Sequence, residues 1–279
     1  MCASQVVGHQ QSIPSPSRYS VESIEAVSNA LLDLTTDFSL AAFCTPNTIE
    51  RYLKARKGDI NAAEDMLRST LEWRRRSRPE TITWKDVEKA GQYGRIEIAA
   101  ETDRSGRPII FYQLKRPMTA CSVEEQTNFW IYNLETACKM ADDAGVGQVI
   151  VAADLANFSE GLTQLASFIL LAQNHYPERL AFAVLSRPPT LFWLAWSAAQ
   201  AFLDEKTRAK ISLVYTNEEL RTALLPHIQP AHLYESLGGD KKDHFDLQKH
   251  RQRMQLIDLE RQREAGFFKR SSQNAVEVQ

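Results

Sequence analysis

Two charged residues, Glu178 and Lys210, each precede a short apolar run of the chain. The runs, residues 181–185 and 211–215, are rich in residues that suit a buried, pleated strand. If the two strands are parallel neighbours, both charges lie at the same end of the sheet. There they either pair with each other or hold a polar ligand. A third interpretation leaves them as exposed charges at two strand entrances, which are common and weakly coupled.

The sequence lacks the motifs of common enzyme classes. It has no GxxxxGK[ST], GxGxxG or HExxH pattern and no GxSxG nucleophile turn. Its six histidines are scattered, and its four cysteines show no CxxC spacing. We therefore expect no catalytic residue, no cofactor and no metal site, although a serine, histidine and aspartate that meet only in the folded chain stay open.

A very apolar segment, residues 191–203 (LFWLAWSAAQAFL), lies between the two strand-like runs. Thr190 is a candidate cap, and at a helical period the polar residues Thr190, Ser197 and Gln200 share one narrow stripe. A helix of this length rises only about 20 Å, short of the roughly 30 Å hydrocarbon core of a bilayer. It is therefore either a buried core helix or a movable helix that covers an apolar cavity and meets lipid when it opens.

The N-terminal third of the chain predicts helices. Residues 1–20 lack apolar periodicity and are predicted to be disordered. A weak helix is expected over 22–34, a second from the Thr45-Pro46 start signal to Gly58, and a third over 60–76. The basic run 74–78 is interpreted as a solvated face.

From residue 79 the pattern alternates between strands and helices. Residues 95–99 and 108–113 predict a hairpin through the turn-forming segment 103–106, and 148–153 predicts a further buried strand. Helices are expected over 123–144, 161–174 and 217–225, so a mostly parallel sheet with right-handed crossovers is the predicted centre. Residues 241–265 predict a charged helix docked on the surface, followed by an untethered tail.

Composition limits the function further. The 279 residues are 43% apolar and 24% charged, with a net charge of -2. Such a chain should build a substantial core and has no global basic field to attract nucleic acid, so we expect no nucleic-acid partner. No apolar signal segment precedes the cysteines, which predicts free thiols and a cytoplasmic location, and acylation of Cys2 is not expected.

Several separate motifs together resemble the CRAL-TRIO lipid-binding family, and within it the secretory-pathway phosphatidylinositol transfer proteins. They occur in the family's order over about residues 45–240 and are RYLKARK (51–57), EWR (72–74), DRSGRP (103–108), NHYPER (174–179), FLDEKTRAKI (202–211) and LGG (237–239). The resemblance implies an α/β fold with a small N-terminal helical unit packed on a mixed, mostly parallel sheet flanked by helices. It also implies a cavity for one phospholipid beneath a helical gate.

The resemblance also assigns roles to residues. The positions that match phosphatidylinositol headgroup recognition are Arg56, Lys57, Glu178, Thr207 and Lys210. Such a site is chemically sensible, because a phosphate diester favours cationic donors and an inositol ring favours mixed donors and acceptors. The apolar helix becomes the gate, and its gate and cavity residues would be Leu191, Phe192, Leu194, Trp196, Phe202 and Leu203.

Some positions depart from the family pattern. Gly58 replaces a bulky apolar residue, Ser186-Arg-Pro188 stands where Asn-Ala-Pro is usual, and Ala156-Asn157 interrupts an expected glycine. Relatives that carry phosphatidylcholine place hydroxyl side chains at four positions that align here with Ile110, Val149, Val151 and Ala172. We therefore expect phosphatidylcholine to bind poorly, and a sterol or other apolar molecule is a candidate second ligand.

The prediction is thus a non-enzymatic phosphatidylinositol transfer protein that exchanges its lipid between membranes or presents it to a lipid-modifying enzyme. It would act as a monomer, with transient contact to the membrane surface. The alternatives are a sensor or scaffold of the same family for another hydrophobic molecule, and an α/β hydrolase of lipid esters. The predicted divisions are a disordered or loosely helical segment (1–44), the helical unit (45–78), the lipid-binding domain (79–240) and the charged C-terminal helix and tail (241–279).

Overall fold

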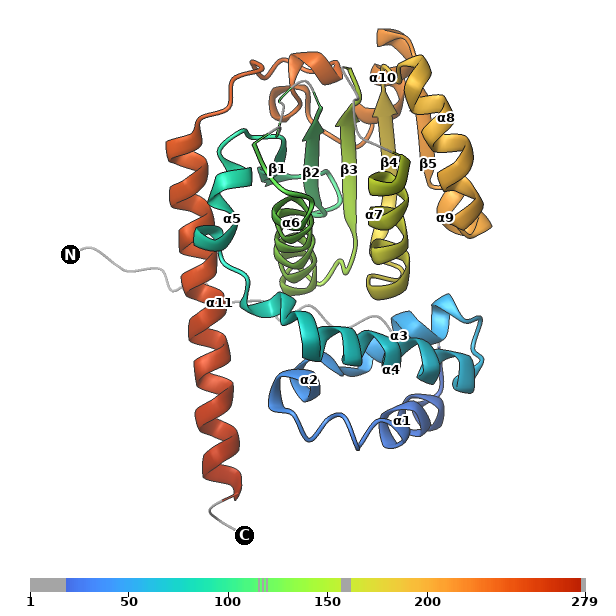
Figure 1. Cartoon of the computed structure of the whole chain (residues 1–279), viewed down its shortest axis with the longest axis vertical. Coiled ribbons are helices and arrows are strands. Elements are labelled where there is room, and N and C mark those ends of the chain that lie inside the picture. Colours follow the sequence, from blue (N-terminus) through green and yellow to red (C-terminus); the bar gives the residue numbers. More distant parts are fainter. Residues whose placement is uncertain (1–18, 115, 117, 119, 157–161, 277–279) are drawn as a thin grey trace, which may run out of the picture.

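The computed structural model describes residues 19–114, 116, 118, 120–156 and 162–276; for 162–165, 191, 195, 199, 202 and 265–276 only the backbone is described. The predicted disorder of residues 1–20, the unmodified Cys2 and the departure at Asn157 therefore lie wholly or almost wholly outside the described residues. Figure 1 shows a central sheet with helices on its faces, a group of N-terminal helices at one end and a long C-terminal helix along one side.

The sheet has five strands in the order β1-β2-β3-β4-β5. β1 pairs antiparallel with β2, and each of the remaining neighbours is parallel. The predicted hairpin and the mixed, mostly parallel sheet are thereby confirmed. The strands are β1 (Ile96–Thr102), β2 (Pro108–Gln113), β3 (Val149–Asp154), β4 (Leu180–Ser186) and β5 (Ile211–Val214).

Alternating side chains of the strands build a separate core on each face of the sheet. On one face, Ile98, Ile110 and Val149 pack against the long helix α6 (Val123–Asp143) and α7 (Leu162–His175). On the other, Phe111 and Ile150 pack under α10 (Asn217–Leu224) and the short turns η3 (Pro230–His232) and η4 (Glu235–Leu237). Because successive strand residues point to opposite faces, neighbouring residues of β2 serve two different cores.

The N-terminal helices form a small unit with its own core. They are α1 (Val21–Ala30), α2 (Phe38–Phe43), α3 (Pro46–Ala55) and α4 (Ile60–Ser77). Thr45 caps α3 as predicted, its hydroxyl accepting from the Thr48 amide, and Gly58 follows the helix at φ 89°. Val27 and Leu40 share one core with Leu53 and Leu67. We propose that this unit begins near residue 20 and not at the predicted boundary of residue 45.

The prediction that residues 74–78 form a solvated face is wrong for Arg74. This arginine lies one and two helical turns after Leu71 and Leu67, so it points into the protein with them. There its guanidinium donates to both carboxylate oxygens of Glu135 on α6, at 2.8 and 2.9 Å. The charge is tolerated because this bidentate partner compensates for lost hydration.

The C-terminal helix α11 (Leu247–Val276) packs beside α5 (Trp84–Gly91), which follows the short turn η1 (Pro79–Thr81). Met254 is buried there, and Asp258 accepts from the Trp84 amide and the Tyr132 hydroxyl. The predicted docked helix is thus present, with bounds that start and end later than expected. In Figure 1 it extends well past the body of the sheet.

The apolar segment after β4 is broken into three short helices. They are α8 (Thr190–Ala199), the 3-10 turn η2 (Gln200–Phe202) and α9 (Glu205–Arg208). The prediction that Thr190 caps the first helix is wrong: Pro189, in extended backbone, precedes the helix, and Thr190 is its first residue. No helix within the described ranges is long and apolar enough to cross a membrane.

Candidate functional site

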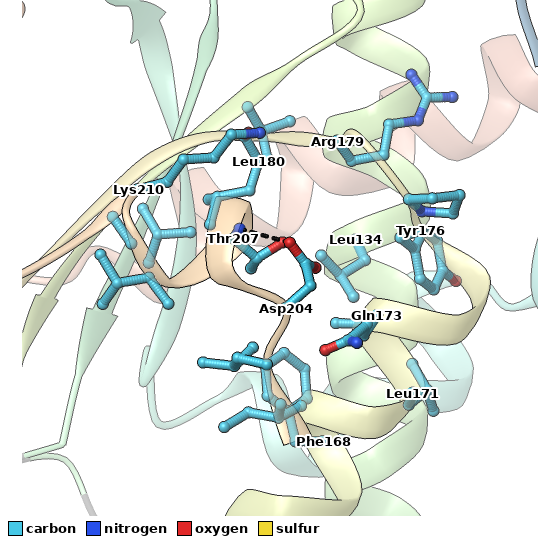
Figure 2. A pocket seen from close by; sticks show the side chains of 18 of the residues that line it. Leu134, Phe168, Leu171, Gln173, Tyr176, Arg179, Leu180, Asp204, Thr207 and Lys210 are labelled. Atoms are coloured by element: carbon cyan, nitrogen blue, oxygen red, sulfur yellow. Dashed lines mark hydrogen bonds between the residues drawn. The ribbon is translucent and has the colours of Figure 1, made fainter. Parts of the chain in front are cut away.

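A cavity of about 970 Å³ lies between one face of the sheet and the helices α6, α7 and α8. This volume is at the upper end of the roughly 300–1,000 Å³ typical of ligand sites. The sheet contributes Ile110, Val151, Ala153 and Leu185, and the helices contribute Trp130, Leu134, Phe168 and Leu171. Figure 2 shows Leu134, Phe168 and Leu171 on the helical side of this cavity. The interior is therefore suited to hydrocarbon.

Charged residues gather at one end of the cavity. All five residues predicted to bind a headgroup line it there, although they come from three separate parts of the chain. Arg56 and Lys57 follow α3, Glu178 lies between α7 and β4, and Thr207 and Lys210 belong to α9 and its approach to β5. The parallel pairing of β4 with β5 explains why Glu178 and Lys210 share one end of the sheet.

Glu178 is the centre of this charged end. Its side chain is only 8% exposed and pairs with Lys54 of α3 at 2.9 Å and with Lys206 of α9. Burial raises the pKa of the carboxyl, but the hydrogen bonds from Lys206 and Lys54 outweigh burial and hold it below the ordinary value. A charged Glu178 therefore joins the N-terminal unit to the foot of the α8–α9 segment.

Lys210 does not form the direct pair with Glu178 that was one interpretation of the sequence. Its ammonium group donates to the Leu180 carbonyl oxygen at 2.8 Å. Burial lowers the pKa of Lys210, and the nearby Lys206 and Lys54 lower it further, while the charge of Glu178 opposes them. The lysines thus crowd one end of the cavity, where an anionic group would relieve their repulsion.

Thr207 is held by the first turn of α9. Its hydroxyl donates to Asp204 Oδ2 at 2.7 Å, and its amide donates to Asp204 Oδ1 at 2.8 Å, as Figure 2 shows for this pair. This capping fixes the turn that carries Lys206 and Lys210. Sequence reasoning missed Lys54, Asp204 and Lys206, although each lies inside or beside a motif that was already singled out.

The α8 segment has an inner and an outer apolar face. Phe192, Trp196 and Leu203 are buried and line the cavity, as expected of gate and cavity residues. Leu194, by contrast, is 63% exposed and faces away from the cavity, next to Trp193, which is 41% exposed. Trp193 stacks on the exposed ring of Tyr215, with ring centroids 6.2 Å apart. The side chains of Leu191 and Phe202 lie outside the described part of the structure.

The four positions that align with phosphatidylcholine-binding hydroxyl residues all line the cavity. They are Ile110 on β2, Val149 and Val151 on β3, and Ala172 on α7. None has a side chain that donates or accepts a hydrogen bond. A polar headgroup placed against them would lose hydration without replacement.

Metal and nucleophile chemistry find little support in the described residues. No group of three or more histidine, cysteine, aspartate and glutamate side chains is placed there to hold a metal ion. The described lining of the cavity includes neither a histidine nor a cysteine. Cys44, Cys121 and Cys138 are free thiols.

Comparison with known proteins defines the class to which this fold and cavity belong. The family model described as the CRAL/TRIO domain matches residues 92–239, and the chain belongs to this family. That assignment confirms the resemblance drawn from the motifs.

Individual relatives are more distant. The chain is 27% identical over 217 residues to the phosphatidylinositol/phosphatidylcholine transfer protein SFH11 of Arabidopsis thaliana, covering 70% of this chain and 57% of that protein. It is 26% identical over 246 residues to the SEC14 cytosolic factor of Candida glabrata, covering 77% and 78%. The crystal structure of Sfh5 matches with a TM-score of 0.60 at 17% identity, over 84% of this chain and 92% of that one, and shows the fold alone. The chain spans about half the length, or less, of several curated relatives.

Proposed function

We propose that this protein binds one phosphatidylinositol molecule in the 970 Å³ cavity and transfers it between membranes. The observation that carries the proposal is the division of the cavity into an apolar interior and a charged end formed by Lys54, Glu178, Lys206 and Lys210. Acyl chains would occupy the interior. The phosphate would meet the lysines, and inositol hydroxyls would donate to Glu178.

The α8–η2–α9 segment would serve as the gate. Exposing about 300 Å² of its inner apolar face to water would cost on the order of 7 kcal/mol, so opening in bulk solvent should be rare. A membrane surface would remove that cost by replacing water with lipid. The exposed Trp193, Leu194 and Tyr215 support a transient contact there, because they form an apolar patch on the outer side of the same segment.

Two alternatives predict different products. A lipid-ester hydrolase needs an activated nucleophile in the cavity, and the described lining offers no histidine to activate a serine. A sensor or scaffold for another hydrophobic molecule would use the apolar interior without the charged end. We favour transfer, with a monomeric protein in the cytoplasm and peripheral contact to membranes, and presentation to a lipid-modifying enzyme as a further use of the same cargo.

Ligand selectivity gives a direct test of the proposal. In a vesicle assay with labelled lipids, phosphatidylinositol should move at least tenfold faster than phosphatidylcholine. Each polar contact that phosphocholine leaves unmade beside Ile110, Val149, Val151 and Ala172 should cost about 1–3 kcal/mol. A sterol, with a single hydroxyl, should suffer less from the apolar wall.

A paired substitution sharpens this experiment. Val151→Thr changes one cavity wall residue to a hydroxyl of nearly equal size and should raise phosphatidylcholine transfer selectively. Val214→Thr, on β5 and in the core of the opposite sheet face, is the matched control. Equal transfer of the two phospholipids by the native protein would refute the selectivity argument.

A further inference from the structure

A second, smaller cavity of about 210 Å³ lies between the N-terminal helical unit and the lipid-binding domain. The segment 176–179 separates it from the lipid cavity, since Tyr176, Pro177 and Arg179 line both. In Figure 2 the side chain of Arg179 extends away from Asp204 and Thr207. The second cavity is polar where the first is apolar: Thr45, Thr48 and Arg51 face it from the helical unit, and Glu135 and Asp142 face it from α6.

Two arginines in its wall share one carboxylate. Arg179 donates to both oxygens of Asp142, at 2.5 and 2.7 Å, and to the Gly147 carbonyl oxygen. Arg51 comes from the opposite wall, and its Nη1 lies 3.6 Å from the same Asp142 carboxylate. Its Nη2 donates to the Thr48 hydroxyl at 2.8 Å. Asp142 thus spends its bidentate geometry on Arg179, and Arg51 receives only a long contact.

Neighbouring charges do not supply the missing anion. Glu135 is occupied by Arg74, and Lys139 by the exposed carboxylates of Asp143 and Glu264. Arg51 itself has a side chain only 15% exposed, and that of Arg179 is 10% exposed. Burial lowers the pKa of Arg51, and the charge of Arg179 lowers it further. The two guanidinium groups therefore repel each other in a poorly hydrated space that an oxyanion would neutralise.

We propose that this second cavity binds a small oxyanion of the phosphate class between Arg51 and Arg179. Planar guanidinium groups match the oxygens of phosphate in pairs, and the Thr45 and Thr48 hydroxyls are further donors beside them. At about 30 Å³ per water molecule, the space admits a phosphate with a small organic substituent. The phosphate would join the helical unit to the strand entrance at Arg179, one residue after Glu178.

The test is calorimetric titration of the full chain with inorganic phosphate at constant ionic strength. Saturable binding is expected, and Arg51→Met should weaken it at least tenfold by removing one guanidinium. Arg75→Met removes the same charge from the exposed side of α4, outside both cavities, and should bind as the native protein does. Asp142→Asn should bind several-fold more tightly, because it removes the competing carboxylate. That variant carries the test if Arg51→Met fails to fold.

Further arms identify the source of the phosphate. Tighter binding of glycerol 3-phosphate would assign a soluble monoester, and binding only to phosphatidic acid vesicles would assign a lipid headgroup, provided that either depends on Arg51. A titration of Lys210→Ala separates the two cavities, because binding at Arg51 should persist there. Absence of saturable binding, binding indifferent to Arg51→Met, or loss of binding in Lys210→Ala would each overturn the proposal.

Discussion

The Glu178→Ala variant should lose at least nine-tenths of its phosphatidylinositol transfer rate. The substitution removes the acceptor that we assign to the inositol ring, and it leaves Lys54, Lys206 and Lys210 without the carboxylate that offsets their charge. One charge-assisted hydrogen bond typically contributes about 1.5–3 kcal/mol, which corresponds to tenfold or more in affinity. Transfer of labelled phosphatidylinositol between vesicles measures the loss.

Three companions define what that loss means. Lys210→Ala should show a loss of similar size, because it removes a cation from the same end of the cavity. Glu178→Gln keeps the shape and tests the charge alone. Glu218→Ala, an exposed carboxylate in the first turn of α10, should transfer normally. Unimpaired transfer by both Glu178→Ala and Lys210→Ala would remove the proposed headgroup site.

The double substitution Trp193→Asp with Leu194→Asp is expected to reduce vesicle binding and transfer at least tenfold while sparing the fold. Both side chains are substantially exposed, so aspartate meets no buried surface in the folded protein. Burial of one large apolar side chain contributes about 1.5–3 kcal/mol, and the variant would forgo two such contributions at the membrane. Vesicle co-sedimentation and the transfer rate report the effect, and native tryptophan fluorescence should shift on vesicle binding.

Two controls separate membrane contact from cavity packing. Leu256→Asp with Leu259→Asp changes two exposed leucines on α11 and should leave transfer intact. Phe192→Asp with Trp196→Asp places charge on the buried inner face and should cripple exchange and also lower the free energy of unfolding. Full vesicle binding by the Trp193 and Leu194 variant would return α8 to the interpretation of a static core helix.

Local signals in the sequence were sufficient for most of the fold. The apolar runs predicted all five strands to within about two residues, because buried strands need continuous apolar sequence whatever their neighbours. Thr45 and Gly58 mark the ends of α3 through capping chemistry that involves only nearby backbone.

Residues whose partners are distant in the chain were harder to predict. Arg74 belongs to a basic run, and only the approach of Glu135, 61 residues later, reveals why it is buried. Likewise, the all-round apolar character of 191–203 could not distinguish the buried Phe192 and Trp196 from the exposed Trp193 and Leu194. The ion pairs of Glu178 with Lys54 and Lys206 depend on three segments that meet only in the folded chain.

The central claim, that the cavity carries an intact phosphatidylinositol, is tested most directly by identifying what the cavity holds. The purified protein is incubated with vesicles of mixed phospholipids and sterol, separated from them, and extracted with solvent for mass spectrometry. The account predicts about one phosphatidylinositol per chain, enriched over phosphatidylcholine relative to the vesicles, and no released fatty acid. Recovery of protein without phosphatidylinositol, or of fatty acid with lysophospholipid, would contradict it.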